Sequence, residues 1–171
     1  MESVVVKYEQ PLLMVIVNMT PDELLEKVKN DFDITVGRST LRNYVNNKLI
    51  PEPQQKVLGR GLGSEATYPP GSEVDVATAN YLLRFHKAEE IAESRAAYKR
   101  IEEKKQLMEY IQFQTKFLEL LTEKKFDELY VYKEQLQDLD YSKSRLWYGG
   151  MCFMKSHRDF LQFERYEHLK Q

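Results

Sequence analysis

Residues 36–53 read VGRSTLRNYVNNKLIPEP and decide the fold of the first half of the chain. Within them, apolar residues recur at spacings of three and four, the period of one helical face: Leu41, Tyr44 or Val45, and Leu49. This spacing predicts a helix from Arg38 to about Lys48 whose other face is polar: Arg38, Ser39, Arg42, Asn43, Asn46 and Asn47. Proline has no amide hydrogen and restricts the residue before it, so Pro51 and Pro53 end that helix.

A second helix start precedes this stretch. Thr20 can cap a helix, Pro21 suits its first position, and Glu23 is placed to complete a capping box. An apolar stripe follows at helical spacing: Leu24, Leu25 and Val28. We expect this helix to end near residues 31–33, and Gly37 to serve as a cap or turn before the next helix.

A β-hairpin is predicted after the prolines, over residues 56–68. Its tip is the glycine-rich run GRGLG at residues 59–63, which lies between the short β-prone runs Val57-Leu58 and Ala66-Thr67-Tyr68.

The rest of the chain is predicted to be helical. Ser72, with Asp75 three residues later, is typical of another capped helix start. From Ser72 to Tyr148 the chain has neither glycine nor proline, which indicates two or three helices in succession. Gly149 and Gly150 would then form a turn between two last helices.

Two short helices, a hairpin and a further helix, in this order, describe a winged helix-turn-helix. The predicted fold class is therefore mainly α, with a β-hairpin wing and long helices that form a C-terminal dimerisation region. We place the DNA-binding domain at residues 1–85 and the helical region at 86–171. Within residues 1–19, whose role is uncertain, 4–8 and 12–17 could form short strands.

Residues 36–44 and 48–53 resemble the recognition helix and following turn of the mercury-resistance regulator (MerR) family. The pattern of that family is Val-Ser-x-x-Thr-Leu-Arg-Tyr-Tyr-Glu, then Gly-Leu-(Leu/Ile)-Pro-x-Pro a few residues later. The resemblance covers residues 20–85 and is that of a distant member. Four positions depart from the pattern: Gly37, Asn43, Val45 and Lys48. The hairpin is also longer than the usual wing of the family, and Tyr68 alone matches the closing aromatic residue of that wing.

The resemblance implies a homodimeric transcription regulator that binds inverted-repeat promoter DNA. The candidate DNA-binding residues are Arg38, Thr40, Arg42, Asn43, Tyr44, Asn46, Lys48, Lys56 and Arg60. By resemblance Arg42 and Tyr44 contact phosphates, although Tyr44 could equally belong to the core. By its chemistry Arg42 can bind phosphate or guanine, and Asn43 has the amide geometry to read adenine. Arg60, near the wing tip, can reach phosphates or a minor groove.

The charge distribution fits this prediction. The chain has 171 residues and a formal net charge of −2, yet residues 34–63 carry five basic side chains and one acid, Glu52. A solvated loop would show the same excess of basic residues, so charge alone does not distinguish a DNA-binding surface from a solvated loop.

Other function classes find little support. The single cysteine, Cys152, excludes an internal disulfide and a multi-cysteine zinc site, and the three histidines are too scattered to suggest a metal site. We find no enzyme signature and expect no cofactor. The early apolar run at residues 12–17 is too short for a signal peptide or a membrane span. We therefore expect a cytoplasmic protein without a membrane partner.

Residues 126–171 hold ten of the twenty aromatic residues of the chain. A helical core or a dimer interface explains them, and a pocket for a flat or cationic effector is the alternative. Two other functions stay open: a winged-helix adaptor that binds proteins, and a DNA-binding protein of the phage excision or partition type.

Overall fold

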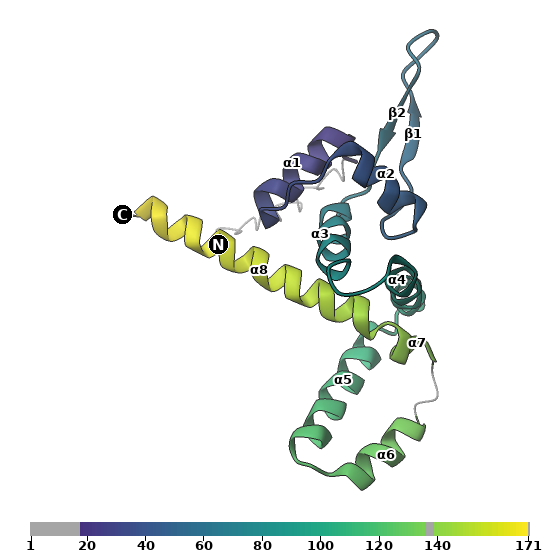
Figure 1. Cartoon of the computed structure of the whole chain (residues 1–171), viewed down its shortest axis with the longest axis vertical. Coiled ribbons are helices and arrows are strands. Elements are labelled where there is room, and N and C mark those ends of the chain that lie inside the picture. The colour runs from purple at the N-terminus through teal and green to yellow at the C-terminus, as the bar shows by residue number, and fades with distance from the viewer. Residues whose placement is uncertain (1–17, 136–138, 171) are drawn as a thin grey trace, which may run out of the picture.

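The computed structural model describes residues 18–135 and 139–170 (Figure 1). Over these residues it contains eight helices and one two-stranded antiparallel hairpin, so the predicted mainly helical class is confirmed. The two short strands predicted at residues 4–8 and 12–17 lie outside the described residues. None of the helices within the described ranges has both the length and the apolar character needed to cross a bilayer.

The first helix, α1, spans Pro21–Phe32, as predicted. Thr20 caps it: the hydroxyl oxygen of Thr20 accepts from the backbone N–H of Glu23 at 3.2 Å. The Glu23 carboxylate in turn accepts from the backbone N–H of Thr20 at 2.9 Å. Three apolar side chains bury one face of the helix: Leu24, Val28 and Phe32.

The second helix, α2, spans Arg38–Asn46 and begins after Gly37, which takes the cap position. It ends slightly before the predicted Lys48, because Lys48 itself adopts a left-handed backbone with φ of 59°. The turn that follows is closed by the backbone N–H of Leu49, which donates to the carbonyl of Tyr44 at 2.9 Å.

The hairpin joins strand β1, Gln54–Val57, to strand β2, Ser64–Thr67, with Gln54 opposite Thr67. It therefore starts two residues before the predicted boundary. A bridge between Met19 and Tyr68 continues the pairing beyond β2. Three tip glycines have positive φ, a conformation that glycine adopts without strain: Gly59, Gly61 and Gly63.

Helix α3 spans Ser72–Leu82, but the predicted cap is wrong. Gly71, with φ of 92°, occupies the cap position, and Ser72 is already the first helical residue. The Ser72 hydroxyl donates back to the carbonyl of Pro69 at 2.6 Å. A glycine in the left-handed conformation lets the chain enter the helix directly after Pro69 and Pro70, so the cap position falls on Gly71 and not on Ser72.

The stretch from Ser72 to Tyr148 holds more helices than the predicted two or three. After α3 come helices α4, Ala88–Glu103, α5, Leu107–Thr122, α6, Phe126–Gln135, and α7, Leu139–Lys143. Two of the breaks fall at lysines with left-handed backbones, Lys105 and Lys124, with φ of 57° and 55°. Paired backbone hydrogen bonds close these helix ends in the way that a glycine usually allows.

The last helix, α8, runs without a break over Arg145–Lys170. The predicted turn at Gly149 and Gly150 is therefore wrong. Gly150 is buried against Leu82 of α3, and a Cβ atom at Gly150 would lie 3.1 Å from three atoms of the Leu82 side chain. This glycine serves a close approach of two helices instead of a change in chain direction.

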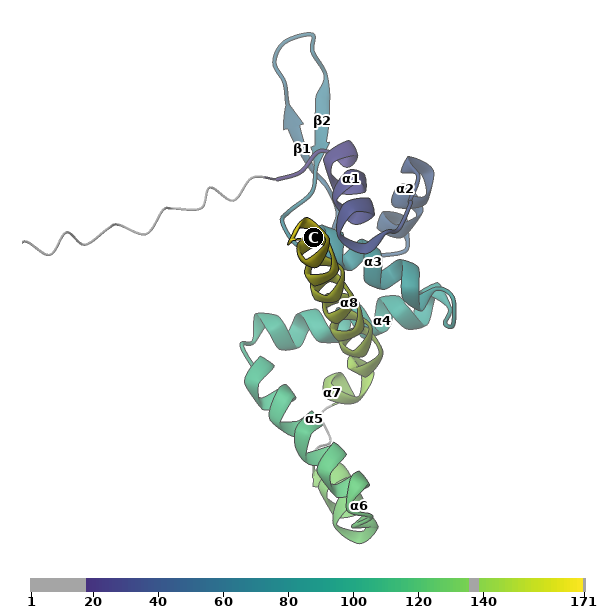
Figure 2. The same ribbon diagram turned by 90° about the vertical axis from the view of Figure 1, so that its left-hand side faces the viewer.

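We call α1, α2, the hairpin and α3 the head, and α5 with α6 the arm. The hairpin and the arm project from opposite ends of the molecule (Figures 1 and 2). Helix α8 packs on α1, α3 and α4, so that Trp147, Met151 and Met154 share one core with Leu24 and Val28. A second, smaller cluster joins α4, α5 and α7: Ile101, Tyr110 and Tyr141.

Candidate nucleic-acid interface

The polar face of α2 is the centre of the candidate site. Leu41 and Tyr44 are buried and fix the helix on the core, with exposed fractions of 2% and 5%. Four predicted site residues are exposed on the same helix: Arg38, Arg42, Asn43 and Asn46. Thr40 is half-buried. The spacing of the apolar residues thus correctly predicted which side chains of this helix face solvent.

Tyr44 is the predicted site residue that the structure places differently from its neighbours. It belongs to the core, which is the second of the two alternatives that the sequence left open. Its hydroxyl oxygen accepts from the side-chain amide of Asn80 on α3 at 3.3 Å. Tyr44 therefore positions α2 against α3, and its burial leaves little surface for a phosphate.

Arg38 at the start of α2 is paired with Asp22 at the start of α1. Its Nε donates to Asp22 Oδ1 at 3.1 Å, and its terminal nitrogen lies 2.7 Å from the same oxygen. This hydrogen bond raises the pKa of the guanidinium. Both side chains are mostly exposed, and exposed ion pairs are weak, so a phosphate or a base can replace Asp22 as the partner of Arg38.

The hairpin supplies two of the three remaining cations. Lys56 is exposed on β1 and stands in register with Glu65 of β2, while Arg60 is exposed at the tip. Apolar side chains are exposed beside them: Val57 at 77%, Leu58 at 44% and Leu62 at 71%. Lys48, between α2 and the hairpin, is exposed as well. The hairpin thus presents cationic and apolar groups together at its far end.

A groove of about 620 Å³ lies between α1, α2 and the hairpin. It brings together Arg38 and Arg42 from α2 and Gln55 from β1. Tyr68 also lines it; burial raises the pKa of this phenol, and the charge of Arg42 opposes the rise. The other predicted cations, Lys48, Lys56 and Arg60, lie outside the groove.

Sequence reasoning missed the acids of this groove, Asp22 and Glu65. Asp22 stood in the capping sequence of α1, but only the placement of α1 beside α2 brings it to Arg38. Glu65 could have been found from a hairpin register, because it is the cross-strand neighbour of Lys56.

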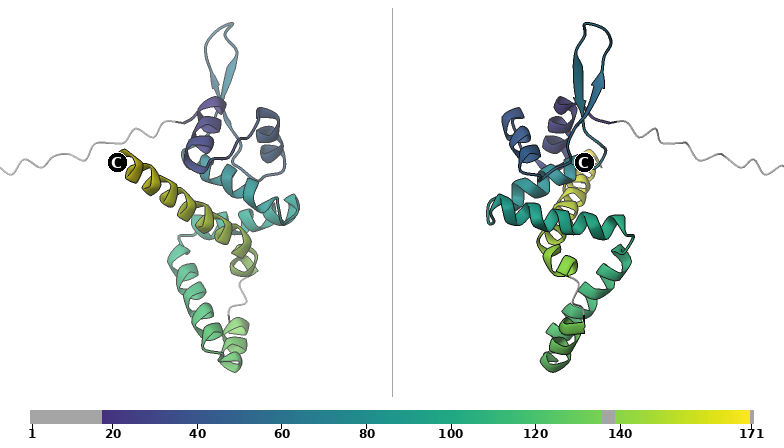
Figure 3. Two further views of the ribbon diagram at one scale, coloured as in Figure 1. Left: turned by 60° about the vertical axis from the view of Figure 1, so that its left-hand side comes forward. Right: turned by 90° about the vertical axis from the view of Figure 1, so that its right-hand side faces the viewer.

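Figure 3 shows α1 and α2 side by side above α3, with the far end of the hairpin projecting beyond both. Across the described residues, no group of three or more histidine, cysteine or acidic side chains is arranged to hold a metal ion.

Comparison with known proteins adds no relative: no protein-family model, curated protein or solved structure matches this chain.

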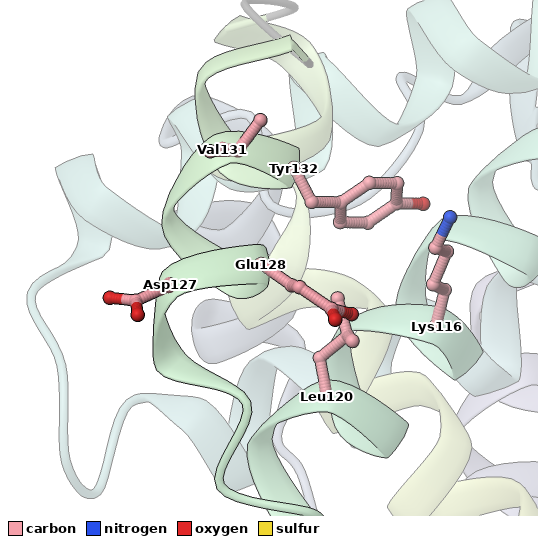
Figure 4. Close-up of a pocket in the computed structure, with 6 residues that line it drawn as sticks. All are labelled: Lys116, Leu120, Asp127, Glu128, Val131 and Tyr132. Carbon is pink, nitrogen blue, oxygen red and sulfur yellow. The ribbon is translucent and has the colours of Figure 1, made fainter.

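The aromatic residues near the C-terminus divide into two sets. One set is packed inside: Trp147 is fully buried, and Tyr110 stacks on Tyr141 with ring centroids 5.5 Å apart. The other set is exposed along α8: Phe153, Phe160, Phe163 and Tyr166. A small cavity of about 360 Å³ between α5 and α6 has one aromatic wall, Tyr132, with the Lys116 ammonium 4.7 Å from its ring centroid (Figure 4). An effector at the aromatic region stays a prediction.

Proposed function

We propose that this protein is a sequence-specific DNA-binding transcription regulator that acts as a homodimer on inverted-repeat promoter DNA. In this proposal α1 and α2 form a helix-turn-helix, α2 is the recognition helix, and the hairpin is the wing. The observation that carries the proposal is the exposed polar face of α2, which combines two arginines and two asparagines beside a projecting cationic hairpin.

The dimensions of α2 suit a major groove. An α-helix with its side chains is about 10–12 Å in diameter, and the groove is about 12 Å wide. Asn43 offers the amide that pairs with adenine, and Arg42 offers the fork that binds guanine or phosphate. Asn46 and Lys48, one turn later, are suited to the backbone.

The hairpin is suited to the DNA that flanks the recognition helix. Lys56 and Arg60 can neutralise phosphates, and Arg60 at the tip can enter a minor groove. Leu62, exposed beside it, resembles the apolar wedges by which architectural proteins open a base step.

The homodimer in this proposal is supported by an exposed, uncharged seam on α5. One seam faces inward and packs on the rest of the chain: Tyr110, Phe113, Phe117 and Leu120. A second set recurs at spacings of three and four on the outward side: Met108, Ile111, Thr115, Leu118 and Thr122. This outward seam contains no charged residue, so two copies can meet along it without repulsion between like charges.

The experiment that tests DNA binding is a titration of random and selected duplexes at several salt concentrations. The five cations of each subunit make about ten phosphate contacts in the dimer, which gives a slope of log affinity against log salt of about −9, at about −0.9 for each neutralised phosphate. Arg42→Ala removes one contact from each subunit, so it should reduce the slope by about two and weaken binding, while Lys143→Ala on α7, at a distance from the candidate interface, should leave both unchanged.

Unchanged affinity in the Arg42 variant would refute the assigned role of α2. No measurable DNA binding by the wild-type protein would refute the regulator itself and favour an adaptor, a reading that the exposed apolar side chains of α8 support. Selection of bound sequences from a random pool tests the dimer separately, because a homodimer of this kind selects inverted repeats.

The dimer contact has its own test. Leu118→Glu places a charge in the outward seam and should convert the dimer to a monomer in sedimentation, while Glu119→Gln, also exposed on α5 but outside the seam, should not. A monomeric wild-type protein would remove the homodimer from the proposal.

A further inference from the structure

A polar cleft of about 530 Å³ lies where α3, α4 and α8 meet, behind the base of the hairpin. Each helix contributes charged side chains to its wall: Glu73 and Asp75 from α3, Lys99 and Glu102 from α4, and Lys155 and Arg158 from α8. Met151, Val74 and three prolines add apolar surface. Neither the candidate DNA interface nor the aromatic region uses these side chains.

The two carboxylates of α3 are buried with few hydrogen bonds. Both residues are 6% exposed. One oxygen of Glu73 accepts from the backbone N–H of Gly71 at 3.0 Å, while its other oxygen lies 3.8 Å from Arg158 and 4.0 Å from Lys27. These last two contacts are too long for hydrogen bonds.

Asp75 is still less satisfied. Within the described residues its carboxylate takes part in no hydrogen bond, and its nearest cation is Arg95, at 3.7 Å. Buried polar groups in folded proteins almost always have hydrogen-bond partners, because burying one without a partner is costly. Neither oxygen of Asp75 is among the fully buried atoms that lack a partner, so this carboxylate opens into the cleft, where a hydrogen-bond donor can reach it.

One of the three cations in the wall also lacks a partner. Lys155 is exposed on α8 and makes no ion pair within the described part of the chain. Lys99 donates to Glu102, which also lines the cleft, at 3.3 Å, and so has two of its three ammonium hydrogens left for a ligand. Within the described residues, Lys155 and Asp75 are thus charged groups of opposite sign that lack a hydrogen-bond partner, and a ligand that carries both charges would satisfy them together.

We propose that this cleft binds a free α-amino acid. Its ammonium group would donate to Asp75 and Glu73, its carboxylate would accept from Lys155 and Lys99, and its side chain would lie on the apolar wall. An amine alone would leave the lysines of the cleft unpaired, and a carboxylic acid alone would leave its carboxylates unpaired. The proposal therefore requires both groups on one small molecule.

The position of the cleft gives such a ligand a route to the hairpin. Pro51 precedes β1 by three residues, and Pro69 and Pro70 join β2 to α3, so both legs of the hairpin begin at the wall of the cleft. Met151, Lys155 and Arg158 belong to α8. A ligand here would touch the helix that closes the core and the base of the wing at once. Its effect on DNA rests on the proposed function above, whereas its binding does not.

Binding is tested by calorimetry of the full chain with each standard α-amino acid at millimolar concentration. For the best ligand, two probes follow: the amine that lacks its carboxylate and the N-acetyl derivative that lacks its ammonium charge. We expect the free amino acid to bind at least about tenfold more tightly than either probe, which is the scale of one lost charge-assisted hydrogen bond. If no amino acid binds, water alone fills the cleft and the proposal is overturned.

Three variants locate the site. Asp75→Asn should weaken the amino acid and the amine by about tenfold or more, while Lys155→Ala should weaken the amino acid and leave the amine unchanged. Glu119→Gln on the arm should change neither. Asp75→Asn is expected to fold, because burial raises the pKa of Asp75 and the neutral amide removes the cost of an ionised carboxylate there. Equal binding in all three variants would place the ligand elsewhere and overturn the proposal.

The effect on DNA is measured last. Saturation with the amino acid should change the affinity for a selected duplex at least about fivefold, and the duplex should change the amino-acid affinity by the same factor. Amino-acid binding without any DNA binding would refute the regulator and keep the site. Binding of both ligands without mutual influence would keep both sites and refute the coupling.

Discussion

Substitution of alanine at the two adjacent glycines of α8 tests the packing of the head against the last helix. Gly149 is exposed, and a Cβ atom there would meet nothing within 4 Å. Gly150 is buried, and a Cβ atom there would lie 3.1 Å from Cγ and both Cδ atoms of Leu82. Both positions are helical, so the gain in helix propensity is the same, about 1 kcal/mol.

The two variants should therefore differ in the sign of their effect. Gly149→Ala gains the propensity term and should stabilise the protein by up to about 1 kcal/mol. Gly150→Ala gains the same term but crowds Leu82, which is 3% exposed and has no space to move into. Crowding of this kind costs about 1–3 kcal/mol, so Gly150→Ala should be neutral to destabilising by about 2 kcal/mol.

Urea denaturation followed by circular dichroism measures the difference, and thermal unfolding provides a second readout. In a chain of this size 1 kcal/mol moves Tm by about 2–4 °C, so the two variants should be separated by at least about 2 °C. Equal stabilisation by both alanines would show that α3 does not approach α8 closely at this point. Destabilisation by Gly149→Ala would show that the chain turns at these glycines instead of continuing as helix.

Three further predictions concern single contacts. Thr20→Ala removes the cap of α1 and should cost about 1 kcal/mol in urea denaturation; an unchanged midpoint would refute the capping box. Ser94→Ala removes the buried hydroxyl that accepts from the backbone N–H of Trp147 at 2.7 Å, and should cost about 1–3 kcal/mol because that N–H is left unpaired. Arg100 holds the pKa of Asp140 below its ordinary value, so the stability that this carboxylate contributes is present above about pH 4 and is lost as the pH falls below that. Asp140→Asn should flatten this part of the profile of unfolding free energy against pH, and a profile with its acid limb intact would contradict the assignment.

The head could be predicted because its signals are local. The capping box of Thr20 and Glu23, the spacing of Leu41 and Leu49, and the prolines after α2 each act within a few residues of the structure that they cause. The exposed face of α2, and with it most of the candidate site, follows from the same spacing.

The predictions from sequence were wrong where the role of a residue depends on a contact distant in the sequence, or where a residue adopts an uncommon backbone conformation. Gly150 was interpreted as a turn residue, but its role depends on Leu82, which the sequence gives no means of placing beside it. Lys105 and Lys124 end helices in the left-handed conformation, which lysine seldom adopts. The residue types at these positions therefore gave no sign that α4 and α5 end there. The ion pair of Arg38 with Asp22 could not be predicted either, because it depends on how α1 packs beside α2.

The closure of the head by α8 bears on how the chain can be divided. Trp147, Met151 and Met154 fill the interior that also holds Leu24 and Val28, so a fragment cut after residue 85 would be left with an unfilled hollow and wet apolar walls. The arm is different, because α4 contacts both α7 and α8 directly and thereby bridges the point from which the arm departs. A shortened version of this protein should therefore keep α8 and can omit the arm, α5 with α6.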